Sequence, residues 1–303
     1  MKTLAVIGFP LKHTLSPLLH NHLFALLGID ARYQALETAA EDLEQVAMRL
    51  RAGDLDGLNI TRPHKIAFRE YLDQVAPEAA IAGAVNCVSV DRAVLRGHNT
   101  DLAGIAQAFE VAGHDCSGEQ VLLLGAGGAA RAAAVALHRM DVAGITVAAR
   151  RLTAAEELIA ALPATHHPAD FQAIELTPHL DSRPFGLLVN ATPVGQWPRV
   201  DEALVGDGQL QREQVVFDMV YNPDDTLLLQ RARSVGCKVI SGLDMFVGQA
   251  LASTELWFPG STGFGSGSLQ PGIDLSALKE LLRAGILKST GRSLTAESPE
   301  ASA

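Results

Sequence analysis

The chain has 303 residues, a length that predicts one large domain or two ordinary ones. Hydrophobic residues make up 48% of the sequence, which is typical of a globular protein with a large core. The formal net charge is −10 and no basic stripe stands out, so neither nucleic acid nor an anionic membrane is expected as a partner.

Three cysteines, Cys87, Cys116 and Cys237, lie far apart in the sequence. An odd and sparse set indicates free thiols in a reducing compartment rather than a disulfide framework. The first ten residues, MKTLAVIGFP, contain an apolar run that is too short for a secretory signal or a membrane span. We therefore expect a cytoplasmic protein.

Short apolar strands alternate with amphipathic helices over the first hundred residues. Strands are expected at 3–9, 31–37 and 57–60, helices at 16–28 and 40–53, and a hairpin at 85–95. Ser16 is expected to cap the first helix, with Pro17 at the first helical position and Gly28 at its end. The repeated strand–helix–strand order predicts a mostly parallel sheet with helices on its faces.

The alternation starts again after Asp101. Apolar residues at positions 102, 105 and 109 predict a helix that Gly113 ends and that is long enough to join two domains. Further strands are expected at 120–124, 144–150, 185–191, 214–221 and 237–242, and further helices at 130–140, 153–162, 243–258 and 275–285. The overall expectation is an α/β protein.

Three local patterns complete the prediction of elements. Thr153 and Glu156 predict a capping box at the start of the helix at 153–162. The Gly/Ser-rich segment 261–272 is expected to be a flexible loop, and the polar residues 291–303 a disordered tail.

The segment GAGGAA, residues 125–130, has the pattern G-x-G-x-x-A and lies between a predicted strand and a predicted helix. Its glycines let the backbone approach a pyrophosphate, and the helix N-terminus offers amide donors and the positive end of the helix dipole. A tight turn without a ligand would use similar glycines, but the strand–turn–helix context favours a dinucleotide. The residues expected to contact the cofactor are Gly125, Ala126, Gly127, Gly128 and Ala129.

The next strand ends at Ala149 without the acidic residue that an NAD site usually has there. Arg150 and Arg151 follow instead. Guanidinium groups grip a phosphate through paired donors, so the pair favours the 2′-phosphate of NADP over NAD. The simpler alternative is a solvated basic pair at the end of a strand.

The stretch GLNITRPHK, residues 57–65, holds a lysine at the end of a stiff turn. Pro63 fixes its own φ and restricts Arg62 to an extended shape. A solvated lysine needs no such turn, so Lys65 is a candidate for contact with a substrate.

Eight motifs resemble, in their order, those of the shikimate dehydrogenase family. They are HTLSP (13–17), NITRPHK (59–65), GAVN (83–86), GHNTD (97–101), GAGGAAR (125–131), NATPVG (190–195), DMVYNP (218–223) and GLDMFVGQA (242–250). The resemblance implies two α/β domains. Residues 1–101, completed by helices within 244–290, would bind substrate, and residues 102–243 would form a Rossmann-type NADP domain. We expect a monomer or homodimer that acts on a small molecule.

The resemblance implies reversible hydride transfer between NADP and the ring alcohol of shikimate, with Lys65 and Asp101 as the catalytic pair. Lysine suits this role because its ammonium stabilises a forming alkoxide and its amine can accept the proton. The residues implied to bind substrate are Thr14, Ser16, Thr61, Asn86, Asp101, Tyr221 and Gln249. Each has a simpler alternative, such as a helix cap for Ser16, a turn for Asn86, core packing for Tyr221 and an exposed helix face for Gln249.

Thr192 and Gly242 are implied as further cofactor contacts, and Asn59 is expected to stabilise its own turn. The family usually has serine at position 14 and glycine at position 244, where this chain has Thr14 and Asp244. These departures leave open a quinate/shikimate dehydrogenase with broader substrate or NAD use. A non-catalytic NADP-binding regulator that kept the fold is an alternative of a different class. The histidines lack the spacing of metal ligands, so no metal is expected.

Overall fold

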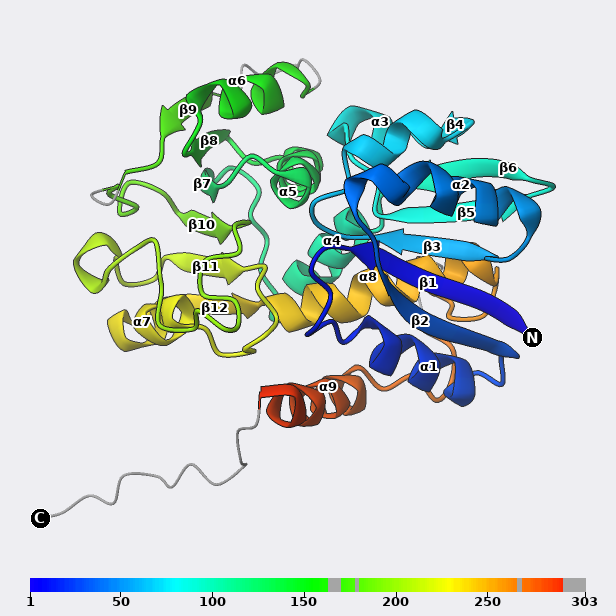
Figure 1. Cartoon of the computed structure of the whole chain (residues 1–303). Helices are drawn as coiled ribbons and strands as arrows, with labels where there is room; N and C mark the ends of the chain where they lie inside the picture. The colour runs from blue at the N-terminus through cyan, green and yellow to red at the C-terminus, as the bar shows by residue number, and fades with distance from the viewer. Residues whose placement is uncertain (163–169, 178–179, 266–268, 291–303) are drawn as a thin grey trace, which may run out of the picture.

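The computed structural model describes residues 1–162, 170–177, 180–265 and 269–290. Two six-stranded sheets, each with its own helices, lie in separate halves of the molecule (Figure 1). Helices α4 (Asp101–Ala112) and α8 (Gly242–Trp257) pass between the halves. Within the described ranges, no helix has both the length and the apolar character that a membrane crossing needs.

The first sheet has the strand order β2-β1-β3-β5-β6-β4. Its strands are β1 (Lys2–Gly8), β2 (Ala31–Glu37), β3 (Gly57–Ile60), β4 (Gln74–Val75), β5 (Cys87–Asp91) and β6 (Val94–His98). Helices α1 (Ser16–Leu26), α2 (Leu43–Ala52) and α3 (Pro77–Ala82) belong to this half. Strands β1, β2 and β3 pair in parallel, whereas β5 pairs antiparallel with both β3 and β6, so the sheet is mixed.

The second sheet is entirely parallel, with the order β12-β11-β10-β7-β8-β9. Its strands are β7 (Gln120–Leu124), β8 (Gly144–Ala149), β9 (Asp170–Glu175), β10 (Leu187–Asn190), β11 (Val215–Asp218) and β12 (Lys238–Ser241), and its helices are α5 (Gly128–Arg139), α6 (Leu152–Ala160) and α7 (Leu227–Val235). This is the Rossmann order: successive strands are added on one side of β7 up to β9 and on the other side from β10 onward, which leaves a crevice at the carboxyl ends of β7 and β10. The predicted α/β class is confirmed.

Two predicted helix caps are wrong. Ser16 is the first residue of α1 and Leu15 precedes the helix, while the Thr14 hydroxyl accepts a hydrogen bond from the Ser16 N–H over 3.4 Å. Helix α6 begins at Leu152 because Arg151 is the last extended residue, so Thr153 lies inside the helix and forms no capping box. A residue whose side chain caps a helix typically has an extended backbone itself, and the pattern of side chains in the sequence does not determine which residue adopts that conformation.

Helix α9 (Leu275–Thr290) packs with α8 and α1 in one hydrophobic cluster. The cluster includes Leu15, Leu19, Leu23, Leu243, Leu251, Leu278, Leu282 and Ile286. The described part of the predicted flexible loop is anchored by the Glu255 carboxylate, which accepts hydrogen bonds from the backbone N–H groups of Gly260, Thr262 and Gly263. Residues 266–268 of that loop and the predicted tail at 291–303 lie outside the described residues.

Helices α4 and α8 cross closely enough to exclude any side chain at Gly104. A Cβ atom there would lie 2.5 Å from the carbonyl oxygen of Met245 and 2.9 Å from the backbone nitrogen of Gln249. These are rigid backbone atoms, so the two helices would have to separate.

Gly104→Ala is therefore expected to lower the free energy of unfolding by about 1–3 kcal/mol, the usual cost of overpacking a core. Chemical denaturation of both proteins measures this difference. The sign of the change in the free energy of unfolding is decisive, because replacing glycine by alanine in an unobstructed helix stabilises the protein by roughly 0.5–1 kcal/mol. A more stable variant would show that the crossing has room for a methyl group.

Candidate active site

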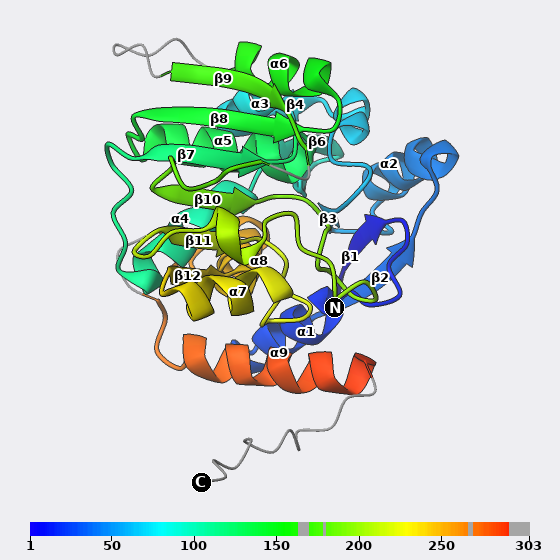
Figure 2. The same cartoon turned by 90° about the vertical axis from the view of Figure 1, so that its left-hand side faces the viewer.

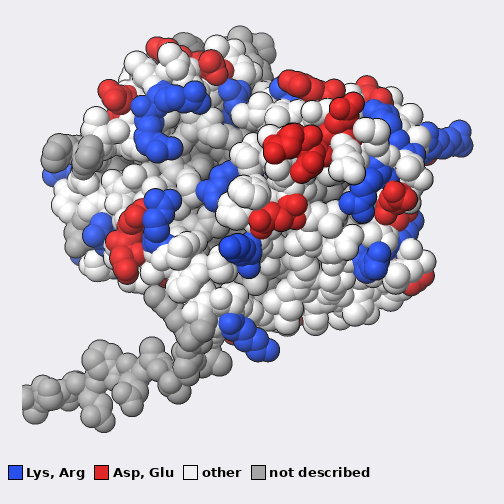
Figure 3. Space-filling view, viewed as in Figure 1, with Lys and Arg blue, Asp and Glu red and all other residues white. Residues whose placement is uncertain are grey.

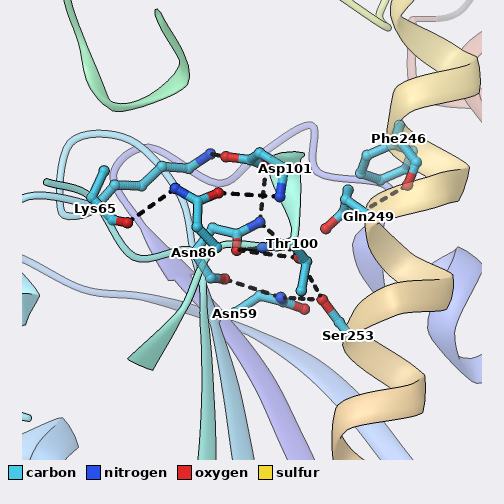
Figure 4. Close-up of polar contacts among 10 residues, drawn as sticks. Asn59, Lys65, Asn86, Thr100, Asp101, Phe246, Gln249 and Ser253 are labelled. Carbon is cyan, nitrogen blue, oxygen red and sulfur yellow. Dashed lines mark hydrogen bonds and ion pairs between the residues drawn. The ribbon is translucent and has the colours of Figure 1, made fainter. Parts of the chain in front are cut away.

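Lys65 and Asp101 form an ion pair between the end of the β3 turn and the start of α4. The Nζ atom of Lys65 donates to Oδ2 of Asp101 over 2.5 Å (Figure 4). The two side chains are 15% and 5% exposed, so the pair is mostly shielded but still reachable. The backbone carbonyl of Lys65 accepts from the N–H of Val85, which ties this turn to the GAVN segment.

Asn86 holds the other side of the Asp101 carboxylate. Its Nδ2 donates to Oδ1 of Asp101 over 2.8 Å, and its Oδ1 accepts from the N–H of Thr100 over 2.6 Å. Asn99 accepts from the N–H of Asp101 and donates to the carbonyl of Ala84. The carboxylate is thus fixed in position, and one of its oxygens faces the lysine.

A buried network supports this site from below. The amide of Asn59 donates to Oγ of Ser253 on α8 over 3.0 Å and to the carbonyl of Asn86 over 3.0 Å, and its oxygen accepts from the hydroxyl of Tyr33. Ser253 is also 2.9 Å from Oγ1 of Thr100 (Figure 4). The expectation that Asn59 stabilises its own turn is therefore wrong, because the side chain links the sheet to α8. Ser253 lies one helical turn after Gln249, and this spacing was the signal that could have identified it.

Three predicted substrate residues lie together at the start of α1. Oγ1 of Thr14 is 3.3 Å from Oγ of Ser16, to which it donates, and Tyr221 hydrogen-bonds with the Thr14 side chain and the Leu15 backbone. The Tyr221 ring stacks on Phe246 with 4.2 Å between centroids. Burial raises the pKa of Tyr221, so its hydroxyl remains protonated at neutral pH.

Gln249 approaches Asp101 from α8, and Thr61 lies in the turn that follows β3. The methyl group of Thr61 packs so tightly against Gly8 that an added Cβ there would overlap it, so the hydroxyl is turned away from β1. Gln249 is 8% exposed and projects from α8 toward Asp101, with its amide donating to the carbonyl of Phe246 (Figure 4). Asn86 and Gln249 thus lie beside Asp101, and Phe246, on whose ring Tyr221 stacks, connects this part of α8 to the residues at the start of α1.

The glycine-rich turn fits a dinucleotide and lies against the side chain of Lys65. Gly125 has φ +109°, and a Cβ there would lie 3.2 Å from the carbonyl oxygen of Ala191, so only glycine suits this position. At Gly128, a Cβ would lie 2.9 Å from Cβ of Lys65. No atom lies within 4 Å of a Cβ at Gly127, so the mouth of the turn is open. The open N-terminus of α5 is a suitable cradle for a pyrophosphate.

Thr192 lies in the turn after β10 and is held there by Asn190, which is itself bonded to the buried carboxylate of Asp218. Asn190 accepts from the N–H and hydroxyl of Thr192 and donates to Asp218 over 2.9 Å. Asp218 also accepts from Thr226 and from the N–H of Val220. Burial raises the pKa of Asp218 to about 6, while these three hydrogen bonds act in the opposite direction. The network fixes the loop after β10 beside the glycine-rich turn.

Arg150 and Arg151 are both exposed at the end of β8. Figure 3 shows Lys and Arg side chains gathered over the region of β8 and β9 on this face. The basic character suits a phosphate. Gly242 is the first residue of α8, where a Cβ would lie 2.5 Å from the carbonyl oxygen of Val220, so the packing of this helix requires glycine at that position.

Other reactive side chains are enclosed. Cys87, Cys116 and Cys237 are buried free thiols. His20 is fully buried, stacks on Tyr33 and has its pKa lowered by burial to about 3, so its imidazole is neutral. Among the residues that the structure describes, no group of three His, Cys, Asp or Glu side chains could hold a metal ion.

Comparisons with known proteins agree with this geometry. Residues 6–88 match the model of the shikimate dehydrogenase substrate binding domain. The shikimate dehydrogenase (NADP(+)) of Moorella thermoacetica is 40% identical over 255 residues, which cover 84% of this chain and 86% of that protein. The match therefore extends through both halves of the molecule.

Solved structures agree as well. The shikimate 5-dehydrogenase of Thermus thermophilus, in complex with NADP(H) and shikimate, is 32% identical with a TM-score of 0.80 and covers 94% of this chain and 100% of that one. The 5-ketofructose reductase of a Gluconobacter species is 30% identical with a TM-score of 0.76 and covers 93% and 98%. The fold is therefore shared by enzymes of different substrates. The identity and coverage of the curated relatives are decisive, and the chain belongs to the shikimate dehydrogenase family.

Proposed function

We propose that this chain is an NADP-dependent shikimate dehydrogenase that interconverts 3-dehydroshikimate and shikimate. The observation that carries the proposal is the shielded Lys65–Asp101 ion pair in direct contact with the glycine-rich turn. A cofactor bound at the turn and a substrate bound at the pair would then be adjacent. The retained pair argues against a non-catalytic regulator, because a sensor has no need of it.

When bound, the nicotinamide supplies or takes up the hydride. Lys65 holds or moves the proton of the reacting hydroxyl, and its ammonium stabilises negative charge on that oxygen. Asp101 orients the ammonium and accepts a hydrogen bond from the same hydroxyl. Asn86 keeps the carboxylate in place through its 2.8 Å bond, so no reorganisation is needed during the reaction.

The remaining predicted residues position the substrate. In this proposal Thr14, Ser16 and Tyr221 bind the carboxylate, while Thr61, Asn86 and Gln249 meet the ring hydroxyls. Support comes from their neutral hydrogen-bonding groups, which suit a polyhydroxylated acid, and from the positions of Asn86 and Gln249 beside Asp101. Such a constellation orients the reacting carbon toward the cofactor.

We also propose the division into domains that the sequence suggested. Residues 1–101 with 244–290 form the substrate domain and residues 102–243 the NADP domain. The shared cluster of α1, α8 and α9 supports this division. We propose the cytoplasm as the compartment, which the three buried free thiols support, and a monomer or homodimer as the assembly.

The direct test is turnover of shikimate with NADP⁺, followed through the absorbance of NADPH. A panel of shikimate, quinate, aminoshikimate and 5-ketofructose with NADP and NAD would separate the alternatives. Preference for shikimate with NADP supports the proposal. Turnover of another substrate alone would make the chain a divergent member of the family, and cofactor binding without turnover would favour the regulator.

Arg150→Ala is expected to raise the KM for NADP about tenfold or more, because a charge-assisted hydrogen bond to the 2′-phosphate contributes roughly 1.5–3 kcal/mol. The KM for NAD should barely change, since NAD lacks that phosphate. Steady-state kinetics with both cofactors measure the effect, and Arg151→Ala shows whether the neighbour shares the phosphate. An equal loss of affinity for both cofactors would make Arg150 a structural residue.

Thr14→Ser is expected to narrow a preference for shikimate over quinate. The extra methyl of threonine restricts χ1 and takes up volume beside Ser16, where the carboxylate is proposed to bind. Shikimate is flat at the carboxylate-bearing carbon, whereas quinate has a tetrahedral carbon with an added hydroxyl. The change in the ratio of kcat/KM should correspond to about 1–3 kcal/mol, the usual effect of one methylene. An unchanged ratio would show that selectivity is set elsewhere in the pocket.

A further inference from the structure

Helix α9 presents two basic side chains on one face. Lys279 and Arg283 are four residues apart and therefore neighbours on the helix surface. Nζ of Lys279 donates to Oδ1 of Asp244 over 2.7 Å, and Nε of Arg283 donates to Oδ2 of Asp224 over 2.7 Å. The Lys279–Asp244 pair is shielded, with side chains 19% and 16% exposed. Helix α9 is thus fixed both to the start of α8 and to the loop that follows β11.

Asp224 lies in the same loop as Tyr221, three residues further along the chain. Its second oxygen accepts from the hydroxyl of Ser241, which caps α8 by accepting from the N–H of Leu243. Asp224 therefore joins the Tyr221 loop, the first turn of α8 and α9. This arrangement also accounts for Asp244, where the family usually has glycine, since Asp244 provides the other attachment point for α9.

The adjoining face of α9 is apolar and lies against α1. Leu278 and Leu282 are fully buried in the cluster that contains Leu15. At Gly285 an added Cβ would lie 2.5 Å from Leu18, so the two helices touch. Figure 2 shows α9 running alongside α1 and beneath α7 and α8. One helix therefore contacts the segment that presents Thr14 and the loop that presents Tyr221.

We propose that α9 is a strap across the two halves of the molecule and that Arg283 is a positioning residue that holds Tyr221 against Thr14. The inference rests on the proposed function, in which Thr14 and Tyr221 bind the substrate carboxylate. Arg283 is 42% exposed, and exposed ion pairs contribute little to stability. Its influence is on the geometry of the carboxylate end of the site, not on the cofactor site or the fold.

The test compares Arg283→Met with Arg283→Lys and two controls. Glu280→Gln removes the other partner of Arg283, and Arg233→Met breaks the exposed ion pair to Asp225, which is adjacent to Asp224 in sequence. Arg283→Met is expected to raise the KM for shikimate about three- to tenfold, the effect of one lost hydrogen bond, with kcat, the KM for NADP and Tm close to the parent values. Arg283→Lys should restore most of the affinity, and both controls should match the parent.

Coupling to Tyr221 provides the second measurement. Adding Arg283→Met to Tyr221→Phe should cause no further rise in the KM for shikimate, because both changes remove the same contact. Additive effects, equal losses for shikimate and NADP, or a parent-like KM in Arg283→Met would each overturn the positioning role. If Arg283→Met does not fold, Arg283→Leu, which also lacks a hydrogen-bond donor, takes its place in the same comparison of the two KM values. A parent without shikimate turnover would instead overturn the proposed function, so the two failures are distinguishable.

Discussion

Replacing Lys65 by alanine is expected to lower kcat by about two to four orders of magnitude, the range for a group that transfers a proton in the transition state. The residue lies 2.5 Å from Asp101 and is mostly shielded, so neither water nor another cation can readily take its place. Binding of shikimate should change far less than kcat. Stopped-flow or steady-state kinetics with saturating substrates measure the loss.

The contact with Gly128 calls for a second variant. The methylene groups of Lys65 pack on this glycine, so alanine removes both the ammonium and part of the contact with the cofactor turn. Lys65→Met keeps the stem and removes only the charge. Both variants should lower kcat to the same extent, whereas only Lys65→Ala should also weaken the binding of NADP. Lys288→Met, at an exposed position on α9, is the control. A folded Lys65→Met enzyme with near-normal kcat would remove Lys65 from the mechanism.

Asp101→Asn is expected to reduce kcat/KM by about two to three orders of magnitude, comparable to the loss of a preorganised polar group in a catalytic site. The two carboxylate oxygens accept from Lys65 and Asn86. An asparagine has one oxygen, so its amide group must face one of these donors with a donor of its own. Asparagine has nearly the same side-chain volume as aspartate, so a large loss of kcat/KM would not be explained by misfolding.

Non-additivity distinguishes a pair that acts as a unit from two independent groups. The double variant Lys65→Met with Asp101→Asn should lose less activity than the product of the two single losses, because part of the effect of Asp101 is to orient the ammonium. Losses that multiply fully would show that Asp101 does not act through Lys65 at all. Asp30→Asn, at an exposed carboxylate, provides the control for charge.

The parts of the fold that the sequence predicted are those with local signals. The turn at Gly125 is encoded within six residues and lies where the sequence placed it. Helix α7 was missed although Thr226 caps it, because its apolar residues Leu227–Leu229 are consecutive and resemble a strand. Strand β9 was missed too, since the alternation of DFQAIE is weak and its partner β8 supplies the pairing.

In the candidate site, too, the contacts that the sequence did not predict join residues that are far apart in the chain. Lys65 and Asp101 are 36 residues apart in sequence, and only the resemblance to a family paired them before the structure did. The role of Asn59 was misjudged because its partner Ser253 is 194 residues away. Contacts at such separations depend on how α8 packs against the first sheet, which no local pattern encodes.

The packing of Gly128 on Lys65 limits how freely the two halves can be exchanged between relatives. A cofactor domain from another family member that had alanine at this position would place a methyl group 2.9 Å from Cβ of Lys65. The halves would have to move apart, and a misplacement of about 1 Å between reacting groups can cost about a hundredfold in rate. For this reason the glycine-rich sequence is more than a nucleotide-binding signature, since one of its glycines also determines how closely cofactor and substrate can be brought together.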